Sequence, residues 1–127
     1  MMKILVVDDE VDVQHLFLQG FRNEIRNGVY AFSFVFDAPS ALLFLDTLKP
    51  TDVFLVLSDI NMPGMSGIEM LKEVKSRRPD LNVVMVTAYG DKKNYEESMK
   101  HGAIDLITKP INFDALREKL SALDISK

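Results

Sequence analysis

The sequence predicts an α/β fold in which a five-stranded parallel sheet is covered on both faces by five helices. Strand-like and helix-like segments alternate without a break along the chain. Residues 53–57 are all apolar, the pattern of a strand buried on both faces. This run leads directly to Asp59, and the carboxyl ends of strands are where open α/β sheets bind ligands.

The composition restricts the class of protein. A chain of 127 residues is expected to form a single domain over 1–127 with a sizeable core. The net charge of -4 argues against a nucleic-acid-binding surface, and the absence of cysteine excludes disulfides and thiolate metal sites. The apolar stretch 4–7 is too short for a signal peptide, and no run approaches membrane-spanning length. We therefore expect a soluble, cytoplasmic domain.

The first segments define a strand, a helix and a second strand. Residues 3–7 are a short apolar strand followed by acids. A single helix is expected next, ending at Asn27-Gly28, with apolar residues at helical spacing: Val13, Leu16, Phe17, Phe21 and Ile25. Residues 30–36 are rich in aromatics and predict the second strand, with one shared face formed by Phe32, Phe34 and Phe36.

Two helices flank the central strand. Ser40 is expected to cap the first of them, which should end at Pro50. Its apolar side is supplied by Leu42, Leu43, Leu45 and Leu48. After the Pro63-Gly64 turn, residues 66–78 predict the second helix. Its inward side chains are Ile68, Leu71 and Val74.

The last third of the chain repeats the alternation. Residues 82–86 predict a fourth strand and 104–107 a fifth. Between them, 92–101 is a weaker helix, whose expected anchors are Tyr95 and Met99. The last helix spans about 113–123, with Asp114 near its start to complement the helix dipole. Right-handed crossovers then favour the doubly wound, flavodoxin-like strand order 2-1-3-4-5.

That topology brings chemistry-bearing side chains to one edge of the sheet. The ends of strands one, three, four and five carry Asp8, Asp9, Asp59, Thr87 and Lys109. Two carboxylates about 4 Å apart repel by about 4 kcal/mol at an effective dielectric constant of about 20. Three of them therefore require a cation or raised pKa values, and one lysine is not enough. Mg²⁺, which prefers oxygen ligands and retains waters, is the expected cofactor.

Taken singly, these residues have ordinary explanations. An Asp-Asp pair before a helix is often a cap, a Thr at a strand end is usually a strand residue, and Lys-Pro usually lies in a surface loop. Their occurrence together at four strand ends favours a functional site.

Four segments resemble the receiver domains of response regulators in two-component signalling. These are Asp8-Asp9, the stretch 59–67, Thr87-Ala88 and Lys109-Pro110. The resemblance covers nearly the whole chain. It implies that Asp59 accepts a phosphoryl group from a phosphohistidine, either on a sensor histidine kinase or on a phosphotransfer protein. The domain would then act as a switch rather than as an enzyme, with slow self-dephosphorylation.

The resemblance also implies roles for the surrounding residues. Asp9, Asp59 and the Asn61 carbonyl would bind Mg²⁺ directly, Asp8 would act largely through water, and Thr87 and Lys109 would contact the phosphoryl oxygens. The implied partner on the output side is an output domain or a downstream protein, without direct nucleic-acid or membrane contact, and a homodimer on activation is allowed. Both the weak trans preference of X-Pro bonds and the resemblance predict a cis bond before Pro110.

One position departs from the family pattern. The residue three before the Lys is commonly aromatic and moves with the Thr, but here it is Leu106. Tyr89, two residues beyond Thr87, could shield the site or report its state, but nothing in the sequence argues that it replaces the missing ring.

Two other functions stay open at this point. A small phosphohydrolase with an aspartyl-phosphate nucleophile would carry an Asp-x-Asp motif. Here Asn61 occupies the position of the second acid, and no cap segment is present to hold a small substrate. The second open function is an interaction module that has kept the fold but lost phosphorylation. The complete set of acids argues against this function.

Overall fold

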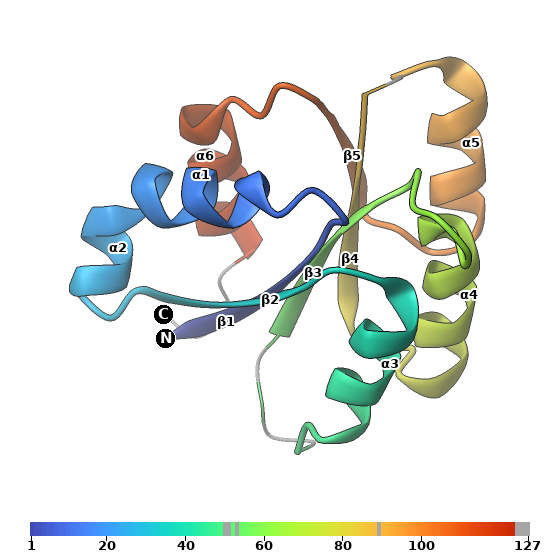
Figure 1. The fold of residues 1–127 in the computed structure, drawn as a ribbon, viewed down its shortest axis with the longest axis horizontal. Helices are drawn as coiled ribbons and strands as arrows, with labels where there is room; N and C mark the ends of the chain where they lie inside the picture. Colours follow the sequence, from blue (N-terminus) through green and yellow to red (C-terminus); the bar gives the residue numbers. More distant parts are fainter. Residues whose placement is uncertain (50–51, 53, 89, 124–127) are drawn as a thin grey trace.

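Five parallel strands form one sheet in the order β2-β1-β3-β4-β5, as predicted (Figure 1). The structure is a computed structural model that describes residues 1–49, 52, 54–88 and 90–123. The strands are β1 (Met2–Val7), β2 (Tyr30–Val35), β3 (Phe54–Asp59), β4 (Asn82–Thr87) and β5 (Asp105–Thr108). Every neighbouring pair is parallel, so each crossover passes over a face of the sheet.

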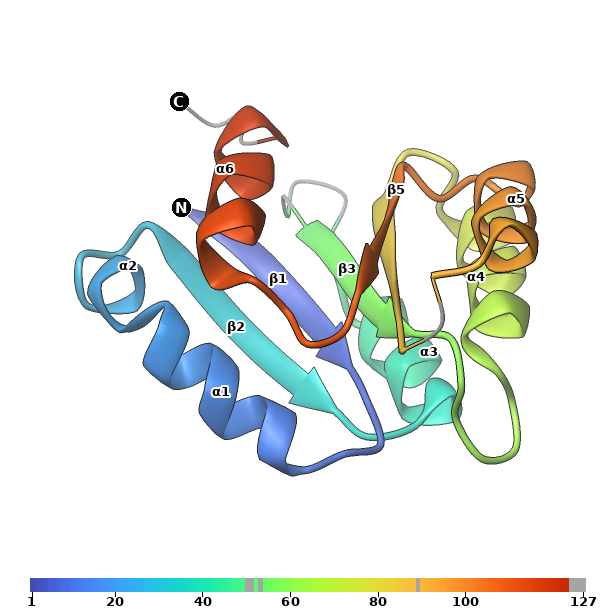
Figure 2. The same ribbon diagram turned by 90° about the horizontal axis from the view of Figure 1, so that it is seen from above.

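Six helices lie in the part of the chain that the structure describes, one more than predicted. They are α1 (Asp12–Gly20), α2 (Arg22–Arg26), α3 (Ala38–Asp46), α4 (Gly67–Arg77), α5 (Lys92–Lys100) and α6 (Phe113–Leu123). Figures 1 and 2 show α1, α2 and α6 on one face of the sheet and α3, α4 and α5 on the other. The doubly wound architecture is therefore confirmed.

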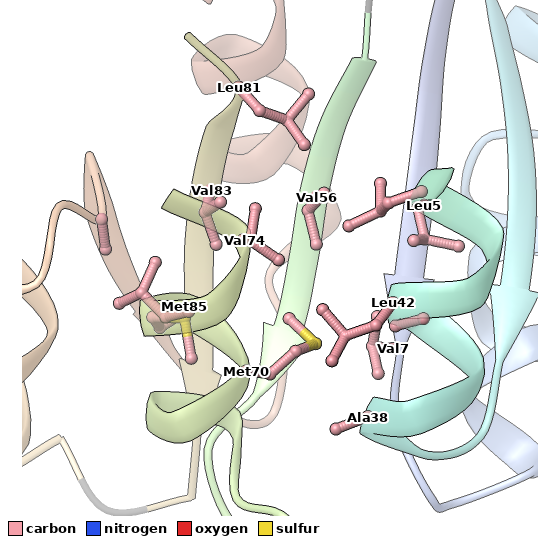
Figure 3. Packing of buried hydrophobic residues seen from close by; sticks show 14 of the residues in the cluster. Leu5, Val7, Ala38, Leu42, Val56, Met70, Val74, Leu81, Val83 and Met85 are labelled. Atoms are coloured by element: carbon pink, nitrogen blue, oxygen red, sulfur yellow. The ribbon is translucent and has the colours of Figure 1, made fainter. Parts of the chain in front are cut away.

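Alternate side chains of the central strands enter two separate cores. On one face, Leu5 and Val56 pack with residues of α3 and α4. Figure 3 shows Leu42 and Met70 pointing toward each other above this face of the sheet. On the other face, Ile4 and Leu57 pack with α1 and α6. Burial on both faces is why the sequence of β3 reads as a continuous apolar run.

The single helix expected over 13–25 is in fact two helices. Phe21, with φ -112° and ψ 24°, separates α1 from α2. Its fully buried ring contacts the rings of Phe17 and Phe113, and a side chain at Gly20 would come within 2.9 Å of the Phe113 ring. The Arg117 guanidinium donates to the Gly20 carbonyl over 2.6 Å. Packing against α6 therefore fixes the break and satisfies a carbonyl at the end of α1.

The expected cap of α3 is also wrong. Asp37, not Ser40, is the N-cap residue, and its carboxylate accepts a hydrogen bond from the Ser40 N–H over 2.7 Å. Pro39 occupies the first turn, where no N–H is needed, so the helix starts before Ser40. The predicted end at Pro50 is wrong as well, because α3 ends at Asp46 with Thr47 as its C-cap, and Leu48 lies beyond the helix.

Several expected anchors face solvent. Leu16, Leu43, Tyr95 and Met99 are exposed, and Phe36 lies beyond the end of β2. In α5 the buried residue is Ser98. Helical spacing defines a stripe, but only the position of the neighbouring elements decides which of its residues are covered.

Candidate functional site

The strand register aligns the carboxyl ends of β1, β3, β4 and β5. Val7 pairs with Ser58, Asp59 with Val86, and Thr87 with Thr108. Asp8 follows β1 and Lys109 follows β5, so the predicted site residues start from adjacent strand ends. This edge is the position at which α/β sheets bind ligands.

The loop after β3 holds the Asp59 backbone against the start of α4. The Gly67 N–H donates to the Ile60 carbonyl over 2.8 Å. A Cβ at Gly67 would overlap the Asp59 carbonyl oxygen and lie 2.8 Å from the Ile60 Cα. Ser66 caps α4, because its hydroxyl accepts from the Glu69 N–H over 3.2 Å. Glycine is therefore required here for close approach of two backbone segments.

Lys109 is brought to the site by β5 and the turn that follows. Its N–H donates to the Thr87 carbonyl over 2.8 Å, and the Lys109–Pro110 bond is cis, as predicted. The ammonium Nζ lies 2.9 Å from Asp8 Oδ2, 3.2 Å from Asp59 Oδ2 and 3.3 Å from Glu10 Oε1. One cation thus contacts three carboxylates.

The acids form a compact cluster with excess negative charge. One carboxylate oxygen from each of Asp8, Glu10 and Asp59 lies within 4.8 Å of the other two. Asp8 and Asp59 are buried, whereas the Glu10 side chain is 65% exposed. The ammonium supplies only one positive charge, so the cluster keeps a net negative charge. Its carboxylate oxygens are donors suited to a hard divalent cation.

Electrostatics perturb both members of the central pair. Burial, followed by the negative charge of Asp8, raises the pKa of the Asp59 carboxyl above its ordinary value, against the opposing effect of Lys109. Burial alone would lower the pKa of the Lys109 ammonium, but the hydrogen bond to Asp8 and the charge of Asp59 outweigh it, and that pKa is raised. Lys109 therefore stays positively charged, and the charged form of Asp59 is disfavoured.

The other expected site residues are placed differently. Thr87 is fully buried at the end of β4. Asp9 and Asn61 are exposed, and the Asn61 N–H donates to Asp59 Oδ1 over 3.3 Å. Asp9 lies outside the acidic cluster found among the described residues. Leu106, at the position where an aromatic is usual, is partly buried against the core beneath α3 and α4. Tyr89 lies outside the described residues.

Glu10 is the site residue that the sequence analysis missed. Its N–H donates to Asp8 Oδ1 over 2.9 Å, which turns the chain at the end of β1. A signal was present, since Glu10 follows Asp8-Asp9 directly at the same strand end. Glu10 and Lys109 also line the edge of a largely apolar cavity of about 480 Å³ beside α1.

Residues 4–121 match the model of the response regulator receiver domain. The chain belongs to this family. Receiver domains are the signalling phosphoacceptor domains of two-component response regulators and work with histidine kinases and output domains. No helix in the described ranges is long and apolar enough to cross a membrane.

Curated relatives include proteins of different lengths. The receiver domain is 34% identical over 116 residues to sporulation initiation phosphotransferase F of Bacillus subtilis, a match covering 91% of this chain and 88% of that protein. It is 39% identical over 119 residues to the transcriptional regulatory protein ZraR of Klebsiella oxytoca, covering 93% of this chain. The matched region is only 25% of ZraR.

Solved structures share the fold. A CheY-like receiver domain protein from Methanospirillum hungatei is 30% identical with a TM-score of 0.82, over 97% of this chain and 93% of that one. The response regulator TrrA from Thermotoga maritima, solved in complex with Mg(2+)-BeF, is 31% identical with a TM-score of 0.77. That match covers 97% of this chain and 99% of TrrA.

Proposed function

We propose that Asp59 accepts a phosphoryl group from a phosphohistidine on a sensor histidine kinase or a phosphotransfer protein. The receiver domain then passes its phosphorylation state to an output domain or a downstream partner. The observation that carries this proposal is the buried Asp59 carboxylate, 3.2 Å from the Lys109 ammonium at the end of β3.

The transfer needs a nucleophile and neutralisation of charge. The ionised Asp59 oxygen attacks phosphorus and forms an acyl phosphate, while the P–N bond to the donor imidazole breaks and its electron pair remains on that nitrogen, which takes up a proton. Lys109, 3.2 Å from Asp59, would neutralise charge on the equatorial oxygens. The hydroxyl of Thr87, at the neighbouring strand end, is proposed to donate to a phosphoryl oxygen of the product.

The donor atoms at this edge fit Mg²⁺, since the clustered ligands are all carboxylate oxygens. Asp9, Asp59 and the Asn61 carbonyl are proposed as its direct ligands, with Asp8 acting through water. Asp9 lies outside the acidic cluster found among the described residues, so this role requires its carboxylate to approach Asp59. A bound Mg²⁺ would supply the positive charge that Lys109 alone does not provide.

Labelling with a small phosphodonor tests the proposal. The protein is incubated with acetyl phosphate, with and without Mg²⁺, and the intact mass is measured. We expect one phosphoryl group on the wild type only with Mg²⁺, and none on Asp59→Asn, which keeps the size of the side chain. Peptide mapping should locate the group on Asp59.

Two results would contradict the assignment. Equal incorporation into Asp59→Asn would place the phosphoryl group elsewhere. Repeated turnover of a generic phosphate ester, in place of stoichiometric labelling, would identify a phosphohydrolase.

A further inference from the structure

Glu10 occupies the third hydrogen-bonding position of the Lys109 ammonium. An ammonium has three N–H donors. In the structure three carboxylates lie within 3.3 Å of Nζ: those of Asp8, Asp59 and Glu10. These carboxylates can engage all three donors, so an incoming phosphoryl oxygen binds the ammonium most readily when one carboxylate gives up its place.

Glu10 is the partner that is easiest to displace. Its side chain is 65% exposed, against 6% for both Asp8 and Asp59. Water can solvate a released Glu10 carboxylate, whereas a released Asp8 carboxylate would remain buried without its cation. The backbone nevertheless keeps Glu10 at the site, because its N–H donates to Asp8 and its carbonyl accepts from the Val13 N–H over 3.1 Å.

The negative charge of Glu10 also opposes the approach of an anionic phosphodonor. The Glu10 oxygen belongs to the set that lies within 4.8 Å of an Asp59 oxygen, so a phosphoryl group arriving at Asp59 meets this negative charge at close range. Both effects oppose binding of the phosphoryl group. Glu10 occupies the ammonium that this group needs, and its negative charge repels the group.

Resting on the phosphoacceptor role of Asp59, we propose that Glu10 is a positioning residue that competes with the phosphoryl group for Lys109. Glu10 thereby slows phosphorylation by anionic donors. It acts through Lys109 and not as a ligand of the metal.

The rate of labelling by acetyl phosphate at saturating Mg²⁺ tests this role. Glu10→Gln should raise the labelling rate about 1.4- to fivefold, the range for one exposed ion pair. The gain should shrink as salt screens the charges. Glu10→Asp, which keeps the charge, should return the rate toward that of the wild type. Melting temperatures should show that all variants are folded.

Asp12→Asn is the matched control, because it removes the same charge from the first turn of α1. An equal gain in the labelling rate of this variant would show that the effect comes from the overall negative charge of the domain, and it would overturn the proposal. A Glu10→Gln rate equal to or below that of the wild type would also overturn it. So would a large loss of Mg²⁺ affinity in Glu10→Gln, which would make Glu10 a metal ligand.

The contact between Glu10 and Lys109 can also be tested without phosphoryl labelling. The nitrogen-15 signal of Lys109 Nζ in the unphosphorylated protein should move in Glu10→Gln and stay in place in Asp12→Asn; an unmoved signal in Glu10→Gln would reject the contact. If the wild type takes up no phosphoryl group, the proposed function fails. If the wild type is labelled and Glu10→Gln is no faster, only the role of Glu10 fails.

Discussion

The Lys109 ammonium lies 3.2 Å from a carboxylate oxygen of Asp59, although the two residues are 50 positions apart in the chain. Parallel pairing of β3 with β4 and of β4 with β5 places their strand ends side by side. The contact neutralises the charge of Lys109 but leaves the buried acids with a surplus of negative charge. This surplus is the reason for the first two predictions.

Asp59→Asn should leave the free energy of unfolding unchanged or raise it near neutral pH without Mg²⁺. The change removes a buried charge whose pKa is raised, while Asp8 still pairs with Lys109. Chemical denaturation of both proteins measures the difference. A clear loss of stability would show that the Asp59–Lys109 attraction outweighs the burial of the charge.

The pH dependence of that difference has a fixed sign. Asp59 holds its proton to higher pH in the folded state than in the unfolded state, because its folded pKa lies above 3.8. The cost of its charge is therefore fully present above the folded pKa and disappears as the pH falls below 3.8. The advantage of Asp59→Asn should shrink correspondingly on acidification, and an advantage that grows instead would reverse the assigned pKa direction.

Mg²⁺ should raise the melting temperature of the wild type. A tenfold excess over the dissociation constant stabilises the folded state by about 1.4 kcal/mol through mass action. Asp9→Ala should weaken the effect more than Asp8→Ala, and Asp12→Asn should leave it intact. Scanning calorimetry over a millimolar range of Mg²⁺ provides the test, and identical melting curves with and without the ion would refute the site.

Gly67→Ala should destabilise the domain by about 2–4 kcal/mol and reduce labelling of Asp59. The added methyl group would overlap the Asp59 carbonyl oxygen, and backbone atoms cannot move aside as a flexible side chain can. Gly64→Ala, in the same loop, is the control, since its cost comes from a positive φ of 76° in open space. Equal losses of labelling in the two variants would count against the close approach at Gly67.

Ser98→Ala should stabilise the domain by roughly 1 kcal/mol. Ser98 is fully buried in α5, and its hydroxyl has no hydrogen-bond partner among the described residues, so the substitution removes an unsatisfied polar group. Ser76→Ala, at an exposed position of α4, controls for the better helix propensity of alanine. If both variants gain the same stability in urea, propensity alone accounts for the effect.

The order of the elements, the strand order and the edge that carries Asp59, Thr87 and Lys109 could be predicted from the amino-acid sequence. The apolar runs and helical stripes are local patterns, and right-handed crossovers leave few ways to combine them. The acids after the first and third strands and the lysine after the fifth could therefore be assigned to one site before any distance was known.

Other features depend on packing partners that are distant in the sequence, and these features emerge only in the folded protein. Phe21 interrupts the first helix because residues near the other end of the chain, Phe113 and Arg117, pack against α1. Ser98 is buried in place of Tyr95 because the contacts of α5, not its spacing, select the covered side. Glu10 follows Asp8-Asp9 directly, which places it near the same strand end. Its contact with Lys109, from the opposite end of the sequence, is set only by the folded geometry, because the length and direction of the two side chains decide whether they meet.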